Sequence, residues 1–250
     1  MIKIEGKKFD WFGLTQILKE HKGKLRQIRM LSVNELKKKY KGAALGPLWA
    51  LIKPTFTLFI LWFAFEIGLK RNGGVHFING KYTQFVFMLT GYVPWFYISE
   101  CIVGGSRSIR SNKQFVTKLS FPVSNIMTFT SLSGLYIHIL LCAIMYVVLL
   151  CLGFGPSIYN LQFIYYALMM YFFFLVLSWM TAPLSAFSKD FENLINSVIT
   201  GLFWLSGIFW NTYDISPLWL RKLMYFNPIN YFVNGYRTVS YTHLTLPTKA

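Results

Sequence analysis

The chain has 250 residues, of which 54% are hydrophobic and only 14% are charged. Soluble domains carry about 45–50% apolar and about 25% charged residues, so this composition indicates a membrane protein. The formal net charge of +16 could suit nucleic-acid binding. However, the basic residues flank long apolar runs, as topology signals and contacts to anionic lipid do, and we expect no nucleic-acid partner.

The N-terminal segment, residues 1–46, holds 12 of the 25 Lys and Arg residues. Leu14 and Leu18 are spaced by one helical turn, and Val33, Leu36 and Tyr40 repeat at three and four residues. This periodicity predicts a cytoplasmic amphipathic segment. It fits a helix on the membrane surface and a helix packed on a partner equally well.

Five apolar stretches follow, and each approaches or exceeds the ~20 residues that a helix needs to cross a bilayer. We therefore expect an all-α, polytopic membrane domain over residues 47–240. The predicted crossings lie at about 47–69, 83–103, 123–152, 161–187 and 194–210.

Beyond the fifth crossing, two semi-apolar stretches at about 216–226 and 229–239 are separated by Asn227-Pro228. Both are too short to cross a bilayer, so we expect short surface or re-entrant helices on the outer side. Residues 241–250 are polar and rich in threonine, and we interpret them as a non-native or truncated tail.

The distribution of basic residues predicts the orientation. With the N-terminus inside, residues 1–46, 104–121 and 188–192 lie inside and hold 17 Lys and Arg residues. The outer loops, 70–82 and 153–160, hold three. The positive-inside rule therefore places the N-terminus in the cytoplasm.

Signatures of catalysis are missing from the sequence. There is no phosphate-binding loop and no nucleophile elbow. The four histidines are too scattered for a metal site. We expect neither enzymatic activity nor a cofactor in this chain.

Polar and aromatic residues at membrane depth are candidates for a translocation path. Glu100 lies near the inner end of the second crossing, where a charge is often functional but is also tolerated near the interface. Tyr165, Tyr171, Trp204 and Trp210 could stack on sugar rings, or could simply anchor and pack the helices.

Gly42 and Gly46 bracket a small-residue pattern at the entry to the first crossing. This pattern permits close helix packing, and it equally suits a flexible joint. We favour the joint.

Several ordered stretches together resemble the ABC-2 type permeases of polysaccharide exporters, the group that exports O-antigen, capsule and teichoic acid. They are 40–49 (YKGAALGPLW) with Pro54, 91–95 (GYVPW) with Glu100, 112–118 (NKQFVTK) with Phe121-Pro122, 188–193 (SKDFEN), and 227–230 (NPIN) with Tyr236-Arg237.

The resemblance implies a permease that moves a polysaccharide or lipid-linked glycan across the bacterial cytoplasmic membrane. It implies two copies forming a channel, and separate ABC ATPase subunits that bind the ATP. It also implies six crossings, so the sixth would be missing from this chain. Arg107, Arg110 and Lys113, which recur every three residues, are then expected to contact the ATPase, with Asp190 as a weaker candidate. Attraction to anionic lipid would explain the three cations equally well.

Other functions remain open at this stage. An ABC-2 permease for a drug or a small lipid would share the same architecture. A secondary transporter would show paired repeats with broken helices, and none is evident. A membrane scaffold or integral membrane enzyme is a further alternative, but no cluster of polar catalytic groups marks one membrane face.

Overall fold

The structure is a computed structural model, and it describes residues 13–68, 84–117, 121–212 and 215–241. The predicted outer loop 70–82 and nearly all of the predicted tail 241–250 lie outside these residues. The described elements are α1 (Leu14–His21), α2 (Leu25–Lys39), the 3-10 turn η1 (Gly46–Leu48), α3 (Trp49–Trp62), the π-helical turn η2 (Phe63–Gly68), α4 (Gln84–Ser111), α5 (Lys113–Thr117), α6 (Val123–Cys151), the 3-10 turn η3 (Ile158–Leu161), α7 (Gln162–Phe187), α8 (Lys189–Leu205), α9 (Leu218–Tyr225) and α10 (Pro228–Tyr241).

Within the described ranges, four helical segments are long and apolar enough to cross a membrane. They are Gly46–Gly68, Gln84–Ser111, Val123–Cys151 and Ile158–Phe187. The first, third and fourth lie within a few residues of the predicted crossings. The second continues about two turns beyond its predicted end at residue 103.

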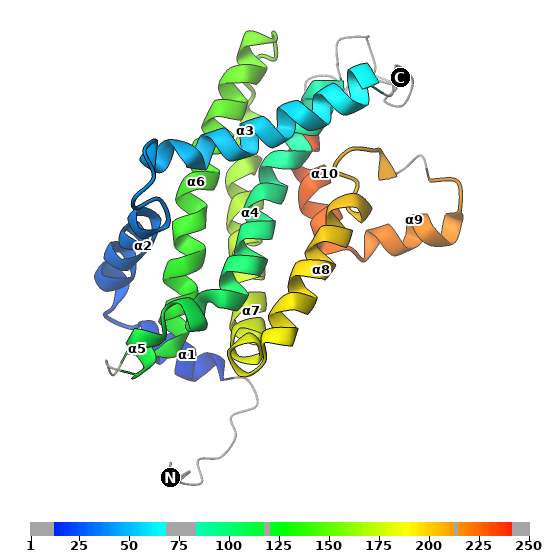
Figure 1. The fold of residues 1–250 in the computed structure, drawn as a ribbon. Helices are drawn as coiled ribbons and strands as arrows, with labels where there is room; N and C mark the ends of the chain where they lie inside the picture. The colour runs from blue at the N-terminus through cyan, green and yellow to red at the C-terminus, as the bar shows by residue number, and fades with distance from the viewer. Residues whose placement is uncertain (1–12, 69–83, 118–120, 213–214, 242–250) are drawn as a thin grey trace.

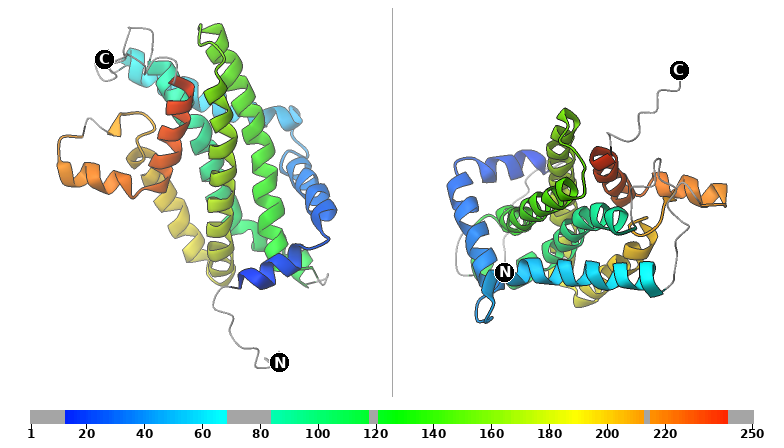
Figure 2. Two further views of the ribbon diagram at one scale, coloured as in Figure 1. Left: turned by 180° about the vertical axis from the view of Figure 1, so that it is seen from behind. Right: turned by 90° about the horizontal axis from the view of Figure 1, so that it is seen from above.

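Helix α4 is the central element of the bundle (Figure 1). In its most apolar stretch 72% of the residues are buried, against 17% to 33% in the other three spanning segments. Helices α6, α7, α8 and α10 pack around it, and α3 crosses the bundle at a large angle to α4 (Figure 1). Seen from behind, α7 stands between α6 and α10 (Figure 2).

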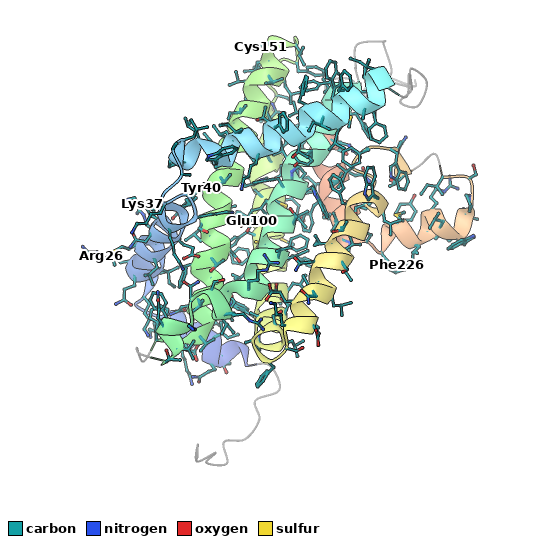
Figure 3. The ribbon with its side chains drawn as sticks, viewed as in Figure 1. Arg26, Lys37, Tyr40, Glu100, Cys151 and Phe226 are labelled. Atoms are coloured by element: carbon teal, nitrogen blue, oxygen red, sulfur yellow. The ribbon has the colours of Figure 1, made fainter. Side chains whose placement is uncertain are left out.

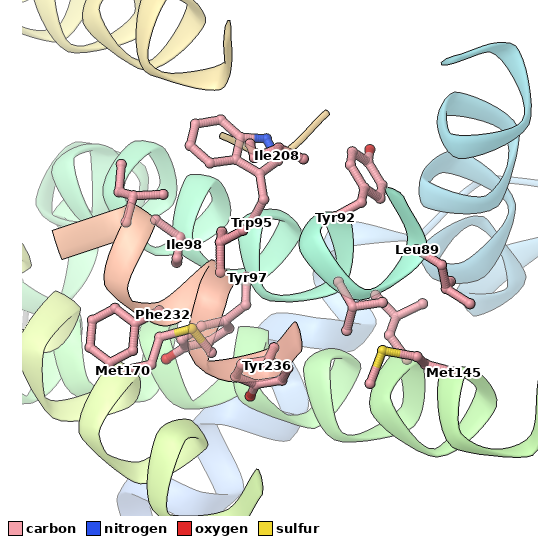
Figure 4. Packing of buried hydrophobic residues seen from close by; sticks show 14 of the residues in the cluster. Leu89, Tyr92, Trp95, Tyr97, Ile98, Met145, Met170, Ile208, Phe232 and Tyr236 are labelled. Carbon is pink, nitrogen blue, oxygen red and sulfur yellow. The ribbon is translucent and has the colours of Figure 1, made fainter. Parts of the chain in front are cut away.

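The main core forms where α4 meets α6, α7 and α10. Tyr97 of α4, Met145 of α6, Met170 of α7 and Tyr236 of α10 are almost completely buried there (Figure 4). Because aromatic and methionine side chains from four helices interdigitate, these helices are held as one body.

The fifth predicted crossing, at residues 194–210, needs correction. Helix α8 begins five residues earlier and ends at Leu205, so it has only 17 residues. The chain turns there because Gly207 adopts a left-handed conformation with φ of 64°, which glycine accepts at little cost. Two short helices, α9 and α10, follow close to the predicted positions 216–226 and 229–239.

The N-terminal segment forms two helices, and α2 packs along α6. The partner of this amphipathic helix is thus a helix of the same chain. The predicted apolar stripe is partly wrong, because Val33 is exposed. The buried stripe instead steps by four residues through Ile28, Ser32, the half-buried Leu36 and Tyr40, and the serine hydroxyl is satisfied by the backbone of its own helix.

Gly42 and Gly46 form the joint between α2 and the first spanning segment. Their φ angles are 84° and 50°, in the left-handed region that favours glycine. A Cβ atom on either residue would meet no neighbour within 4 Å. Within this chain these glycines therefore make no close helix–helix contact, and they lie at a turn between α2 and the first spanning segment.

Candidate functional site

One end of the bundle carries the last turns of α4 and α7 and the first turns of α6 and α8; we call it the basic end. Residues 104–121 were predicted to be a basic loop there, and this prediction is wrong for most of the segment. Helix α4 continues to Ser111, and α5 occupies Lys113–Thr117. Arg107 and Arg110 therefore project from a rigid helix.

These two arginines meet Glu192, in the first turn of α8. Arg107 Nε lies 2.6 Å from one oxygen of the Glu192 carboxylate, and Arg110 Nη1 lies 3.4 Å from the other. Arg110 also donates to the backbone carbonyl of Ser185 in the last turns of α7. The Glu192 side chain is only 13% exposed. We call these three charged residues the clamp, because they join α4, α7 and α8.

The clamp is held by geometry as well as by charge. The spacing of three residues puts both arginines on one face of α4. A carboxylate near a helix N-terminus interacts favourably with the helix dipole, and Ser188 caps this N-terminus by accepting from the backbone N–H of Asp190 at 3.1 Å. The α8 end is thus preorganised to present Glu192.

The other two predicted coupling residues do not join the clamp. Lys113 lies in α5, after the turn at Asn112, and is exposed. Asp190 is also exposed and adds negative charge to the first turn of α8. Both remain available to a partner at the basic end.

A second polar link joins α2 to α4. Lys39 Nζ lies 2.5 Å from Glu100 Oε1, and Lys38 donates to the Asn112 side chain at 3.1 Å. Figure 3 labels Tyr40 at the end of α2 and Glu100 on α4, and the Tyr40 side chain is buried. Burial, and secondarily the charge of Glu100, raise the pKa of Tyr40 to about 12.

The four aromatic path candidates do not converge on one surface. Trp204 and Trp210 come together at the end of α8, where the Trp210 indole donates to the Trp204 carbonyl at 2.9 Å. Tyr165 and Tyr171 lie on α7, the first exposed and the second packed against the core. The rings that contact Trp204 are Phe203 and Phe209, and Phe203 also meets Tyr92 edge-on and Trp95 at a tilt.

A buried arginine holds the bend after α8. Arg237 of α10 is 5% exposed. Its guanidinium donates to the carbonyls of Gly207 at 2.7 Å and Ile208 at 2.5 Å, and it lies 3.5 Å from the centroid of the Phe87 ring. Carbonyl acceptors and an aromatic face compensate a buried cation. Arg237 therefore ties α10, the bend and α4 together.

Comparison with known proteins agrees with this architecture. The family model described as ABC-2 type transporter matches residues 26–241, which is most of the chain. The chain belongs to the ABC-2 type transporter family. It is thus a permease, the non-catalytic membrane subunit of a transporter whose ATP is bound by an ABC ATPase partner.

Relatives of this permease have names that state a cargo. It is 25% identical to a protein named O-antigen export system permease protein RfbA from Myxococcus xanthus, over 84% of this chain and 78% of the relative. It is 26% identical to a protein of the same name from Klebsiella pneumoniae, over 87% of this chain and 83% of the relative. A second Klebsiella pneumoniae protein of that name is also 26% identical, over 83% and 77%.

The permease family carries no cofactor of its own. In the described part of the chain, no three His, Cys, Asp or Glu residues lie close enough to hold a metal ion.

Two residues that organise the permease were not predicted as site residues. Glu192 lay in a segment predicted to be a charged loop. Nothing in the sequence identifies this carboxylate as the partner of Arg107 and Arg110. Arg237 had a signal, because a lone arginine in a semi-apolar stretch at membrane depth needs compensation. Its carbonyl acceptors are set by the bend, which the sequence does not reveal.

Proposed function

We propose that this permease is the membrane half of an ATP-driven exporter of a polysaccharide or lipid-linked glycan. The observation that carries the proposal is that relatives named as O-antigen export permeases align with the chain over more than four fifths of its length. Such a cargo is too polar to cross hydrocarbon unaided, so a protein path is required.

We further propose the membrane in which the permease acts and its oligomeric state. The permease acts as a homodimer in the bacterial cytoplasmic membrane, with the channel between two copies, as the family resemblance implies. The basic end faces the cytoplasm, because α1, α2 and the clamp concentrate Lys and Arg there. In this assembly α8 serves as the fifth crossing, ending at the bend held by Arg237.

The clamp supports a route for coupling. An ATPase bound at the basic end would touch the exposed Lys113 and Asp190, and the clamp joins the same region to α4, α7 and α8. A push on the start of α8 is therefore passed to the central helix through an ion pair rather than through loop backbone. The clamp can bias the equilibrium between channel states only if ATP binding by the partner changes the contacts of Arg107, Arg110 or Glu192.

The test is co-expression of the permease with ABC ATPases from glycan-export loci, followed by purification in mild detergent and measurement of ATP hydrolysis. We expect a stable complex whose ATPase rate depends on the permease. Charge reversal by Arg107→Glu should lower this stimulation about tenfold, because it places a second anion beside the nearly buried Glu192. The double variant Arg107→Glu/Glu192→Arg should recover only part of it, because it restores the pair with position 107 but places a cation beside Arg110.

Two further variants separate coupling through the clamp from direct contact. Lys113→Glu changes an exposed lysine near the clamp, and Arg26→Glu changes an exposed cation on α2 (Figure 3). If only the clamp variants lose stimulation, coupling runs through the clamp, whereas loss in Lys113→Glu alone identifies a direct contact. A folded permease that forms no complex with any of these ATPases would refute the proposed function.

A further inference from the structure

A small cavity with aromatic and amide side chains in its wall lies beside α10, away from the basic end and outside the features described so far. Its volume is about 210 Å³, and tyrosines from three helices line it: Tyr166 of α7, Tyr225 of α9 and Tyr231 of α10. Asn230 and Asn234 of α10 provide the polar part of the wall. The position of Tyr166 in the second turn of α7 puts the cavity near the end of the bundle opposite the basic end.

The aromatic wall is rigidly placed. Tyr166 packs so closely on Gly235 that a Cβ atom there would come within 2.2 Å of the ring, so this glycine allows α10 to rest on the ring. The rings of Tyr166 and Tyr231 are 5.9 Å apart. Tyr225 and Tyr231 are both more than half exposed.

The polar wall is positioned from behind. Asn234 donates to the Asn230 side chain at 3.0 Å, and Asn230 donates to the Met224 carbonyl at 3.0 Å. Arg237, already held by the bend, donates to Asn234 Oδ1 at 3.2 Å. Asn234 also donates to the Thr212 hydroxyl at 3.4 Å, so both of its N–H groups are used. One N–H of Asn230 and a second lone pair on each amide oxygen remain for a ligand.

Amides and phenols are costly on a surface that faces hydrocarbon. A simple interfacial belt needs aromatic rings but not a pair of asparagines fixed by a buried arginine. The combination of aromatic faces with oriented amides matches a sugar ring, which has an apolar C–H face and hydroxyl groups at its edge. The cavity is also smaller than the about 300–1,000 Å³ usual for drug-sized ligands, which favours a single ring.

We propose that this cavity binds one pyranose ring of the glycan cargo, with Tyr231 stacking on the sugar face and Asn230 and Asn234 bonding its hydroxyls. The inference rests on the proposed function and names a subsite for its cargo. The site lies on α7, α9 and α10, apart from the aromatic cluster at the end of α8. Cargo leaving the basic end would meet it late in transit.

The test is saturation-transfer difference NMR with the whole permease in phosphatidylcholine nanodiscs, free of glycoside detergents, which would compete. The probes are the methyl pyranosides of glucose, galactose and mannose. We expect transfer to the ring protons of at least one probe. Tyr231→Ala should reduce it about fivefold, the effect of losing one aromatic contact, while Tyr231→Phe keeps the ring and most of the signal.

Tyr159→Ala is the matched control, because Tyr159 and Tyr231 are both 51% exposed and Tyr159 does not line the cavity. Equal signals from folded Tyr231→Ala and Tyr159→Ala would overturn the site, as would absence of transfer from every probe in the unaltered protein. If the permease couples to an ATPase and exports glycan but shows no transfer, the site alone fails. If it binds the probes at Tyr231 but couples to no ATPase, the site stands and the proposed function fails.

Discussion

Gly91→Ala probes the contact on which the bend depends. A Cβ atom at Gly91 would lie 2.5 Å from Arg237 Nη2 and 3.0 Å from the Ile208 carbonyl oxygen. The guanidinium cannot retreat without giving up its bonds to Gly207 and Ile208. Hydrogen bonds to a charged group contribute about 1.5–3 kcal/mol each, so losing one or two costs about 3 kcal/mol. The higher helix propensity of alanine offsets about 1 kcal/mol of this loss in unfolding free energy. The expected net loss of unfolding free energy is therefore about 2 kcal/mol.

The assay is reversible unfolding of the purified permease in mixed micelles, followed by far-UV circular dichroism as denaturing detergent is added. Gly201→Ala is the control, because Gly201 is also inside a helix and its Cβ atom would meet nothing within 4 Å. This variant should be neutral or more stable by up to about 1 kcal/mol. If Gly91→Ala proves as stable as Gly201→Ala, the close approach of Arg237 and the bend to α4 is refuted.

Two further predictions concern the link between α2 and α4. Burial raises the pKa of Tyr40 from 10.0 to about 12, so its contribution to stability is complete below pH 10 and is lost as the pH rises toward 12. Thermal unfolding from pH 9 to 12 should show this loss in the unaltered permease and less of it in Tyr40→Phe; identical pH profiles would contradict it. Lys39 and Glu100 are 38% and 36% exposed, so a double-mutant cycle with Lys39→Met and Glu100→Gln should give a coupling below about 1 kcal/mol. This coupling should shrink in high salt, whereas a large, salt-insensitive coupling would mean that the pair faces hydrocarbon.

The spanning helices were largely predictable from sequence. Long apolar runs form helices in a bilayer because each backbone polar group must be satisfied within its own segment. For this reason the segments beginning at Gly46, Val123 and Ile158 appear close to their predicted positions. The prediction failed at the ends of helices. Helix α4 continues through Arg107 and Arg110 to Ser111, because these turns beyond the apolar run pack on neighbouring helices and their arginines form ion pairs with Glu192.

The site was less predictable. Arg107 and Arg110 were singled out through the family resemblance, and the structure places both on Glu192. Lys113 shares their three-residue spacing but follows a turn, so it leaves the shared face. Trp204 and Trp210 come together, while Tyr165 and Tyr171 do not join them, because α7 and α8 present different faces to their neighbours.

Sequence alone determined the class of protein, the approximate crossings, the charge asymmetry and the family, because these depend on composition and on local order along the chain. Tertiary structure decided which charges meet and where the chain bends back. Three contacts illustrate this: Arg107 with Glu192, Arg237 with the Gly207 carbonyl, and Tyr166 with Tyr231. The two residues of each contact are between about 30 and 85 positions apart in the sequence. Such contacts depend on helix packing rather than on sequence spacing, since only packing brings distant segments within hydrogen-bonding reach.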